Sequence, residues 1–231
     1  MRQLILDLIP DHPPTLENFV AGGNADALTA LAGWLSPESR EPSLLLWGEA
    51  GAGKTHLLRA CCALTTPANY ADAADDPALQ HLPPLNSVES FFAIDNVEAL
   101  NNAGQIALFN LFNRLRADGG RLLTSASAPP LQLSLREDLR TRLGSGLIYR
   151  LRPLSDAEKI AALGKQASLR GMRLSDEALN YILNRAPRDM RSLSAFLAAL
   201  DLYSLEHKRP LTLPLLRELL QAQQSSLESA S

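Results

Sequence analysis

The chain has 231 residues, of which 46% are hydrophobic, and its 22 Lys and Arg against 25 Asp and Glu give a formal net charge of -3. This composition supports one large domain, or a core domain with a smaller companion. It argues against autonomous binding to duplex DNA, which requires a basic face. The apolar residues 1–10 include Asp7 and are too short for a secretory signal, and no stretch reaches the length of a membrane span. We therefore expect a cytoplasmic protein with no membrane partner.

The two cysteines, Cys61 and Cys62, are adjacent in the sequence. Neighbouring helical side chains point in different directions and cannot form a standard bridge, so we expect small buried thiols rather than a disulfide framework. The histidines at positions 12, 56, 81 and 207 have no cysteine or carboxylate at metal-ligand spacing. We expect surface or packing roles for them.

Segments typical of strands and of helices alternate as far as about residue 149. In chain order, the pattern predicts a helix over 25–34 capped by Asn24, a strand over 44–47, a helix after it, a short strand near 69–70, a strand over 90–94, a helix over 105–116 that stops at Gly119, and strands over 121–125 and 146–151. This alternation is typical of an α/β fold with a parallel sheet, whose ligand binds at the carboxyl ends of the strands.

Only helix signals follow residue 154. A capping box at Ser155 and Glu158 begins a helix that ends near Gly171, and further helices are predicted from Ser175 to before Pro187, over 188–205, and over 212–221. We expect four parts in the chain: an N-terminal tail at 1–14, a core at 15–153, a helical lid at 154–224 and a frayed tail at 225–231.

One motif between the first predicted strand and its helix indicates the chemistry of the core. It reads G-x-x-x-x-G-K-[ST] and consists of Gly48, Glu49, Ala50, Gly51, Ala52, Gly53, Lys54 and Thr55, followed by His56. In this setting backbone N–H groups surround phosphate oxygens at a helix N-terminus, Lys54 reaches the β- and γ-phosphates, and the Thr55 hydroxyl binds Mg²⁺. The alternative is a glycine-rich turn that happens to contain Lys and Thr.

A second motif is the apolar strand over 91–94, which ends at Asp95. Such a strand is typical of a Walker B segment, which delivers a carboxylate to the Mg²⁺ site beside the P-loop; the alternative is a core strand whose terminal Asp caps a turn. Asn96 follows, where hydrolytic P-loop ATPases commonly place a second acid. An amide cannot accept a proton, so we expect slow intrinsic hydrolysis.

The ordered series of motifs resembles the AAA+ module shared by the bacterial replication initiator DnaA and its homologue Hda. The segments that carry this resemblance are 15–20 with Gly22 and Asn24, 46–48, 51–58, 93–96, 121–125 with Pro129 and Pro130, 138–143 and 151–156. The resemblance covers almost the whole chain. It implies a P-loop AAA+ core, with a parallel sheet between helices, followed by a small all-α lid.

Two features resemble the Hda branch of this family more than DnaA. First, we expect no helix-turn-helix domain after the lid. The opening Gln3, Leu4, Leu6 and Leu8 are similar to the peptide by which Hda docks on the DNA sliding clamp: alternate apolar side chains enter a pocket and the glutamine amide bonds its rim. Without this resemblance, a six-residue segment such as 3–8 is more often a first strand or a frayed end of the chain.

The resemblance also implies roles for two arginines. Arg142 falls at the arginine finger, which acts in trans on the γ-phosphate of a neighbour's ATP. Arg191 falls at the lid arginine called sensor 2, which contacts phosphate in its own subunit. Ser125 lies near the sensor 1 position, but the family more often has an acid where this chain has Ser127. Arg140 is the alternative to Arg142, since only motif alignment separates them.

The resemblance therefore implies an adaptor that binds ADP or ATP with Mg²⁺, docks on the sliding clamp, and stimulates ATP hydrolysis on DnaA through Arg142. Such an adaptor negatively regulates replication initiation, has a weak ATPase of its own at most, and is able to form a homodimer. The nearest alternative is an autonomous AAA+ ATPase such as a helicase loader of the DnaC type. A P-loop small-molecule kinase is more distant, because the helical lid and the order of motifs favour AAA+.

Overall fold

The computed structural model describes residues 13–82, 91–186, 189–207 and 216, with the side chains of 205–207 left out. Contacts divide the chain into two compact units, Pro13–Pro153 and the residues from Leu154 onward. We call them the core unit and the helical unit. The core unit contains the strands β1 (Ser43–Trp47), β2 (Ala68–Asp72), β3 (Phe91–Asp95), β4 (Arg121–Ala126) and β5 (Leu147–Arg150), and the helices α1 (Ala25–Leu35), α2 (Lys54–Leu64), α3 (Asn102–Asp118) and α4 (Glu137–Gly144). Three short 3-10 turns, Gly22–Asn24, Val97–Ala99 and Pro130–Gln132, complete it.

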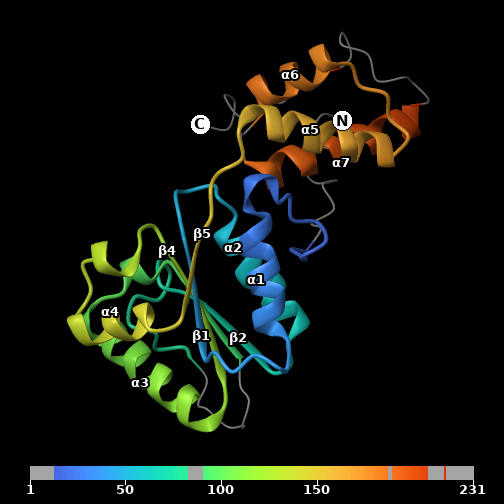
Figure 1. The fold of residues 1–231 in the computed structure, drawn as a ribbon. Coiled ribbons are helices and arrows are strands. Elements are labelled where there is room, and N and C mark those ends of the chain that lie inside the picture. Colours follow the sequence, from blue (N-terminus) through green and yellow to red (C-terminus); the bar gives the residue numbers. More distant parts are fainter. Residues whose placement is uncertain (1–12, 83–90, 187–188, 208–215, 217–231) are drawn as a thin grey trace. The chain divides into compact units, whose positions relative to one another are not determined.

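The five strands form one parallel sheet in the order β2-β3-β4-β1-β5. In Figure 1, α1 and α2 cover one face of the sheet, and α3 and α4 cover the other. Strands β1 and β3 are buried on both faces, which explains why their sequences are continuous apolar runs instead of alternating ones. The predicted parallel α/β fold is confirmed.

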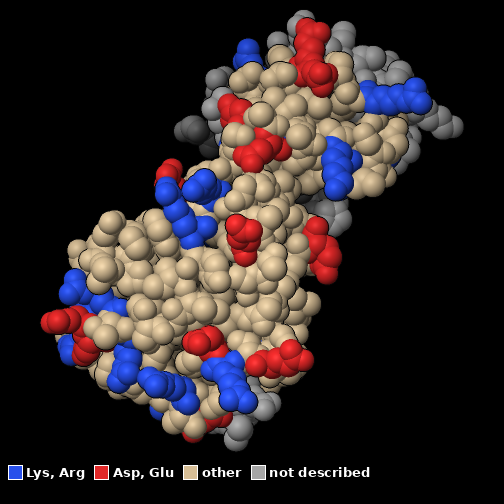
Figure 2. All heavy atoms as spheres, viewed as in Figure 1, with Lys and Arg blue, Asp and Glu red and all other residues tan. Residues whose placement is uncertain are grey.

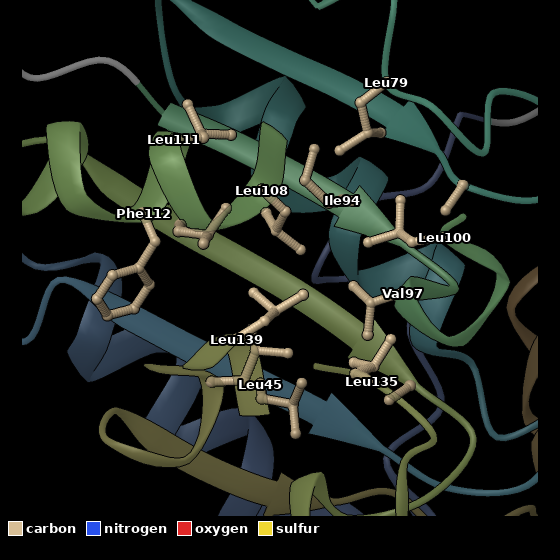
Figure 3. Packing of buried hydrophobic residues seen from close by; sticks show 14 of the residues in the cluster. Leu45, Leu79, Ile94, Val97, Leu100, Leu108, Leu111, Phe112, Leu135 and Leu139 are labelled. Carbon is tan, nitrogen blue, oxygen red and sulfur yellow. The ribbon is translucent and has the colours of Figure 1, made fainter. Parts of the chain in front are cut away.

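Two hydrophobic clusters hold the helices onto the sheet. The cluster on the α3 and α4 face is shown in Figure 3, where Leu108 and Phe112 from α3 and Leu139 from α4 meet Leu45 and Ile94 from the strands. The opposite cluster joins α1 and α2 to the sheet through Trp34, Leu57, Phe91 and other buried side chains. Truncating one such side chain to alanine typically costs about 2–5 kcal/mol, so these clusters fix the strand ends at which the candidate site lies.

The structure corrects one prediction for the core unit and adds one helix to it. Asn24 precedes α1 but its side chain does not cap that helix. Instead the amide donates to the carbonyl oxygen of Arg152 at 2.9 Å and accepts from the N–H of Arg152 at 2.8 Å. The sequence analysis also missed the short helix α4, which carries Arg142. Its polar sequence between two buried leucines, Leu139 and Leu143, gives too short an apolar period to indicate a helix.

The helical unit contains α5 (Asp156–Leu169), α6 (Asp176–Arg185) and α7 (Met190–His207). The predicted capping box is present: the N–H of Glu158 donates to Ser155 Oγ, and the Glu158 carboxylate accepts from the N–H of Ser155 at 2.7 Å. Buried side chains such as Leu163, Ile182 and Leu197 form a core of their own. The helix predicted over 212–221 lies outside the described residues except for Leu216.

No helix within the described ranges is long and apolar enough to cross a bilayer. Lys and Arg are interspersed with Asp and Glu on the face of each unit that Figure 2 shows. Cys61 and Cys62 are free thiols, as expected. Burial raises the pKa of Cys61 to about 12 and that of Cys62 to about 11, so both remain protonated and poorly nucleophilic near neutral pH.

Candidate functional site

The loop between β1 and α2 depends on two glycines that contact other parts of the core unit. A Cβ at Gly48 would overlap the backbone carbonyl oxygen of Leu151. Gly53 has φ +90° at the N-cap of α2, and a Cβ there would lie 2.6 Å from the ring of Phe19. The glycines of the motif are therefore required by close packing and by left-handed backbone geometry. The loop leads directly into the first turn of α2, where N–H groups lack intrahelical partners.

Lys54 begins α2 and folds back over this loop. Its ammonium donates to the carbonyl oxygens of Gly48 at 2.7 Å and Glu49 at 3.0 Å. Burial lowers the pKa of Lys54, and the carboxylates of Glu98 and Asp95 partly offset that effect. A half-buried cation at a helix N-terminus attracts phosphate through both its charge and the helix dipole.

The segment before α1 packs over the loop. The ring of Phe19 lies 5.4 Å from that of His56, and His56 Nε2 lies 2.9 Å from the carbonyl oxygen of Thr15. His56 therefore has a packing and hydrogen-bonding role that joins α2 to residues 15–19. The sequence analysis included this segment only through its family resemblance.

Asp95 ends β3 as a fully buried carboxylate. The Ser125 hydroxyl donates to its Oδ1, and the Tyr70 hydroxyl donates to its Oδ2 at 3.0 Å. Ser125 Oγ also accepts from the N–H of Asn96 at 2.9 Å. The sequence analysis missed Tyr70. The pairing of β2 with β3 would have indicated it. Tyr70 pairs with Ala93, which lies two residues before Asp95 and on the same face of the sheet.

Asn96 follows Asp95 in the left-handed backbone region, with φ +55°. Its side-chain amide donates to Asp72 Oδ1 at 2.9 Å, so the Asn96 side chain joins the ends of β2 and β3. Left-handed geometry is more accessible to asparagine than to most other residues.

The residues predicted for Mg²⁺ are Thr55, exposed in the first turn of α2, and the buried Asp95. No group of three or more His, Cys, Asp or Glu able to hold a metal is present within the described residues. One hydroxyl and one carboxylate nevertheless fit Mg²⁺ as it is bound beside nucleotides, where phosphate oxygens and water supply most ligands.

Arg142 lies on α4, in the core unit, over the rings of Phe109 at 5.8 Å and Phe112 at 5.9 Å. It forms no ion pair with any other described residue. The nearby Asp138 is instead paired with Arg136 at 2.9 Å, and that hydrogen bond lowers the pKa of Asp138. An open hollow of about 820 Å³ is lined by Phe109, Arg136, Glu137, Asp138, Thr141 and Arg142. Arg140, the alternative, is also half-exposed on α4 but does not line the hollow.

Not all of the predicted site residues belong to the core unit. Arg191 is exposed on the first turn of α7, in the helical unit. Gln3, Leu4, Leu6 and Leu8 lie outside the described residues. The core unit contains the P-loop, Asp95 and Arg142, and the roles assigned to all of these residues stay predictions.

Solved structures with the same architecture include two DnaA proteins. Domain III of DnaA from Thermotoga maritima matches with a TM-score of 0.70 at 25% identity, over 92% of this chain and 98% of that one. AMPPCP-bound DnaA from Aquifex aeolicus matches with a TM-score of 0.67 at 23% identity, over 85% of this chain and 68% of that one. The fold and the P-loop thus define an AAA+ protein.

Sequence comparisons refine this class. A family described as the lid domain of Hda matches residues 156–220. An uncharacterized protein from Haemophilus influenzae is 35% identical over 95% of this chain and 98% of its own length. The chain belongs to the Hda/DnaA-like family of AAA+ proteins.

Proposed function

We propose that this protein is a nucleotide-binding adaptor that stimulates ATP hydrolysis on DnaA. It binds ADP or ATP with Mg²⁺ at residues 48–56, docks on the sliding clamp through residues 3–8, and presents Arg142 to the ATP of DnaA. Hydrolysis on DnaA then lowers the activity of the initiator. The observation that carries the proposal is the position of Arg142 on α4, unpaired with any described carboxylate.

The nucleotide proposal rests on the geometry around Lys54. The loop carbonyls of Gly48 and Glu49 hold the ammonium beside the α2 N-terminus, where phosphate would replace them as its partner. Thr55 and Asp95 would hold Mg²⁺, directly or through its water. The ion would neutralise phosphate charge when bound. AMPPCP-bound DnaA supports this ligand class by analogy.

Arg142 has the properties that a group acting in trans requires. Ring faces attract a guanidinium by only about 0.5–1 kcal/mol at exposed sites. A partner's phosphate would offer a much stronger, charge-assisted interaction, so the side chain is free to leave the rings of Phe109 and Phe112. An arginine already bound to a carboxylate would first have to break that pair.

The position after Asp95 supports slow hydrolysis by the protein alone. Asn96 cannot act as a base, and its amide is already bonded to Asp72. Hydrolysis therefore belongs to the complex with DnaA. Clamp docking would raise the effective concentration of Arg142 near DnaA without adding a catalytic group. A homodimer that covers Arg142 would instead reduce the stimulation of DnaA, because Arg142 could no longer reach the ATP of DnaA.

The test is ATP turnover by this protein alone, with DnaA, and with DnaA plus clamp loaded on DNA. We expect little turnover alone, measurable stimulation with DnaA, and strong stimulation in the complete mixture. If the protein alone turns over ATP as fast as the complete mixture, it is an autonomous ATPase of the helicase-loader kind. If nothing is stimulated although DnaA itself is active, the adaptor proposal is wrong.

A further inference from the structure

Tyr70 reaches the candidate magnesium carboxylate from the edge of the sheet. It lies in β2, pairs with Ala93 in parallel register, and packs with the side chains that join α2 to the sheet. Its hydroxyl donates to Asp95 Oδ2 at 3.0 Å. The Arg59 guanidinium, from α2, lies 4.7 Å from the centre of the Tyr70 ring. Two different elements therefore fix the ring beside the end of β3.

The hydroxyls of Tyr70 and Ser125 together occupy both oxygens of Asp95. A buried carboxylate needs such donors, because its charge is otherwise strongly destabilised away from water. Asp95 is thus stabilised by the protein before any cation arrives.

A cation must share this carboxylate with the two hydroxyls. Each hydrogen bond uses a lone pair and withdraws electron density from the oxygen that would face Mg²⁺ or its bound water. We propose that Tyr70 is a positioning residue that competes with Mg²⁺ for Asp95 and so keeps nucleotide binding by this protein weakly dependent on magnesium. This inference rests on the proposed nucleotide site and adds a residue of β2 to it.

A purely structural role for the hydroxyl makes a different prediction. If the hydrogen bond only satisfied a buried Tyr, its removal would change stability and leave the effect of Mg²⁺ on nucleotide affinity unaltered. Competition instead requires that effect to change while the metal-free affinity stays constant. The ratio of ADP affinities with and without Mg²⁺ therefore separates the two roles.

The experiment is calorimetric titration of ADP into the full chain, once with Mg²⁺ and once with a chelator. The variant is Tyr70→Phe, which keeps the ring face over which the Arg59 guanidinium lies. Tyr149→Phe is the matched control: it lies in β5 on the edge opposite β2, and its hydroxyl makes no hydrogen bond within the described residues. We expect Mg²⁺ to strengthen ADP binding about tenfold or more in Tyr70→Phe relative to its effect in the parent, as the loss of one charge-assisted hydrogen bond predicts, and equally in Tyr149→Phe and the parent.

Two results would overturn the inference. An equal magnesium effect in Tyr70→Phe and the parent, with both proteins folded by circular dichroism, shows that the hydroxyl is structural. Absence of ADP binding by the parent in both buffers removes the nucleotide site and this inference with it. If Tyr70→Phe does not fold, Tyr70→Met provides a second variant without a hydrogen-bond donor. Mg²⁺ should strengthen its ADP binding by the same additional factor.

Discussion

Asp95 and Arg142 are the two charged groups on which the proposed function depends, and the core unit holds them in opposite ways. Asp95 is fully buried, and hydroxyls from β2 and β4 bond both of its oxygens. Arg142 is half-exposed over the rings of Phe109 and Phe112, and no described carboxylate pairs with it.

This difference matches two kinds of ligand. A ligand that stays bound to the protein binds more tightly to side chains that are already fixed, because less conformational entropy is lost on binding. A group that must reach another protein's phosphate needs a weak resting contact that it is able to leave. We therefore expect substitutions around Asp95 to alter the stability of this protein and its affinity for nucleotide. Substitutions at Arg142 should alter only the rate of ATP hydrolysis on the partner.

The largest expected effect comes from Arg142→Ala. Loss of the guanidinium should reduce stimulated ATP hydrolysis on DnaA by about a thousandfold, the lower range for an arginine finger. ADP affinity and melting temperature should stay close to their parent values, because the side chain lies over ring faces and forms no ion pair with any described residue. The measurement is phosphate release in a mixture of this protein, DnaA and DNA-loaded clamp.

Arg140→Ala is the matched control, with the same charge change on the same helix. It should retain most of the stimulation. Equal losses in the two variants would mean that α4 contributes a general positive charge, and loss of ADP binding in Arg142→Ala would contradict an action in trans.

The next largest effect should come from Gly48→Ala. The added methyl group overlaps the carbonyl oxygen of Leu151, which belongs to the backbone and cannot rotate away. We expect a loss of about 3 kcal/mol in the free energy of unfolding, as overpacking and backbone strain together predict. Urea denaturation followed by circular dichroism measures it.

Gly51→Ala sharpens that comparison within the same loop. Gly51 also has a positive φ, +78°, but a Cβ there meets nothing within 4 Å. Only the strain of left-handed geometry remains, about 1–2 kcal/mol. If both variants lose the same stability, the contact between Gly48 and Leu151 is not what fixes the loop.

A smaller change, about tenfold or more in ADP affinity, is expected for Lys54→Ala, since a charge-assisted hydrogen bond contributes roughly 1.5–3 kcal/mol. Arg114→Ala removes an exposed charge from α3 and should leave the affinity unchanged. Because burial lowers the pKa of Lys54, affinity in the parent should begin to fall at a lower pH than an ordinary lysine would predict. Unchanged ADP binding by Lys54→Ala would contradict the P-loop assignment.

The parts of this site that the sequence predicted are those with local signals. A glycine motif between a strand and a helix, an apolar strand ending in Asp95, and a capping box at Ser155 each occupy a few consecutive residues. The parallel sheet followed from the same local periodicities, although β2 is longer than the short strand predicted near 69–70.

What the sequence did not predict depends on contacts between distant segments. Tyr70 reaches Asp95 only because β2 and β3 pair in a particular register, and Asn24 bonds Arg152 across 128 positions instead of capping α1. The resting contact of Arg142 with Phe109 likewise requires α3 and α4 to pack together. Such geometry follows from tertiary structure, which single-sequence patterns do not encode.

The smallest effect on the folded protein is expected from Gln3→Ala combined with Leu4→Ala. These residues precede Pro10, Pro13 and Pro14 and lie outside the described residues, and the proposed docking peptide should add little to either hydrophobic core. Melting temperature and ADP affinity should therefore match the parent, while clamp binding, measured by surface plasmon resonance, should be lost. A large drop in melting temperature would show instead that residues 3–8 belong to the fold.

The same double variant distinguishes tethering from catalysis. If the clamp contributes only effective concentration, stimulation of DnaA should fall at low protein concentration and recover in part as the concentration is raised. Arg142→Ala has lost the reacting group itself, so no concentration should restore it. Recovery in both variants would mean that Arg142 assists encounter with DnaA, whereas recovery in neither would mean that the clamp does more than hold the two proteins together.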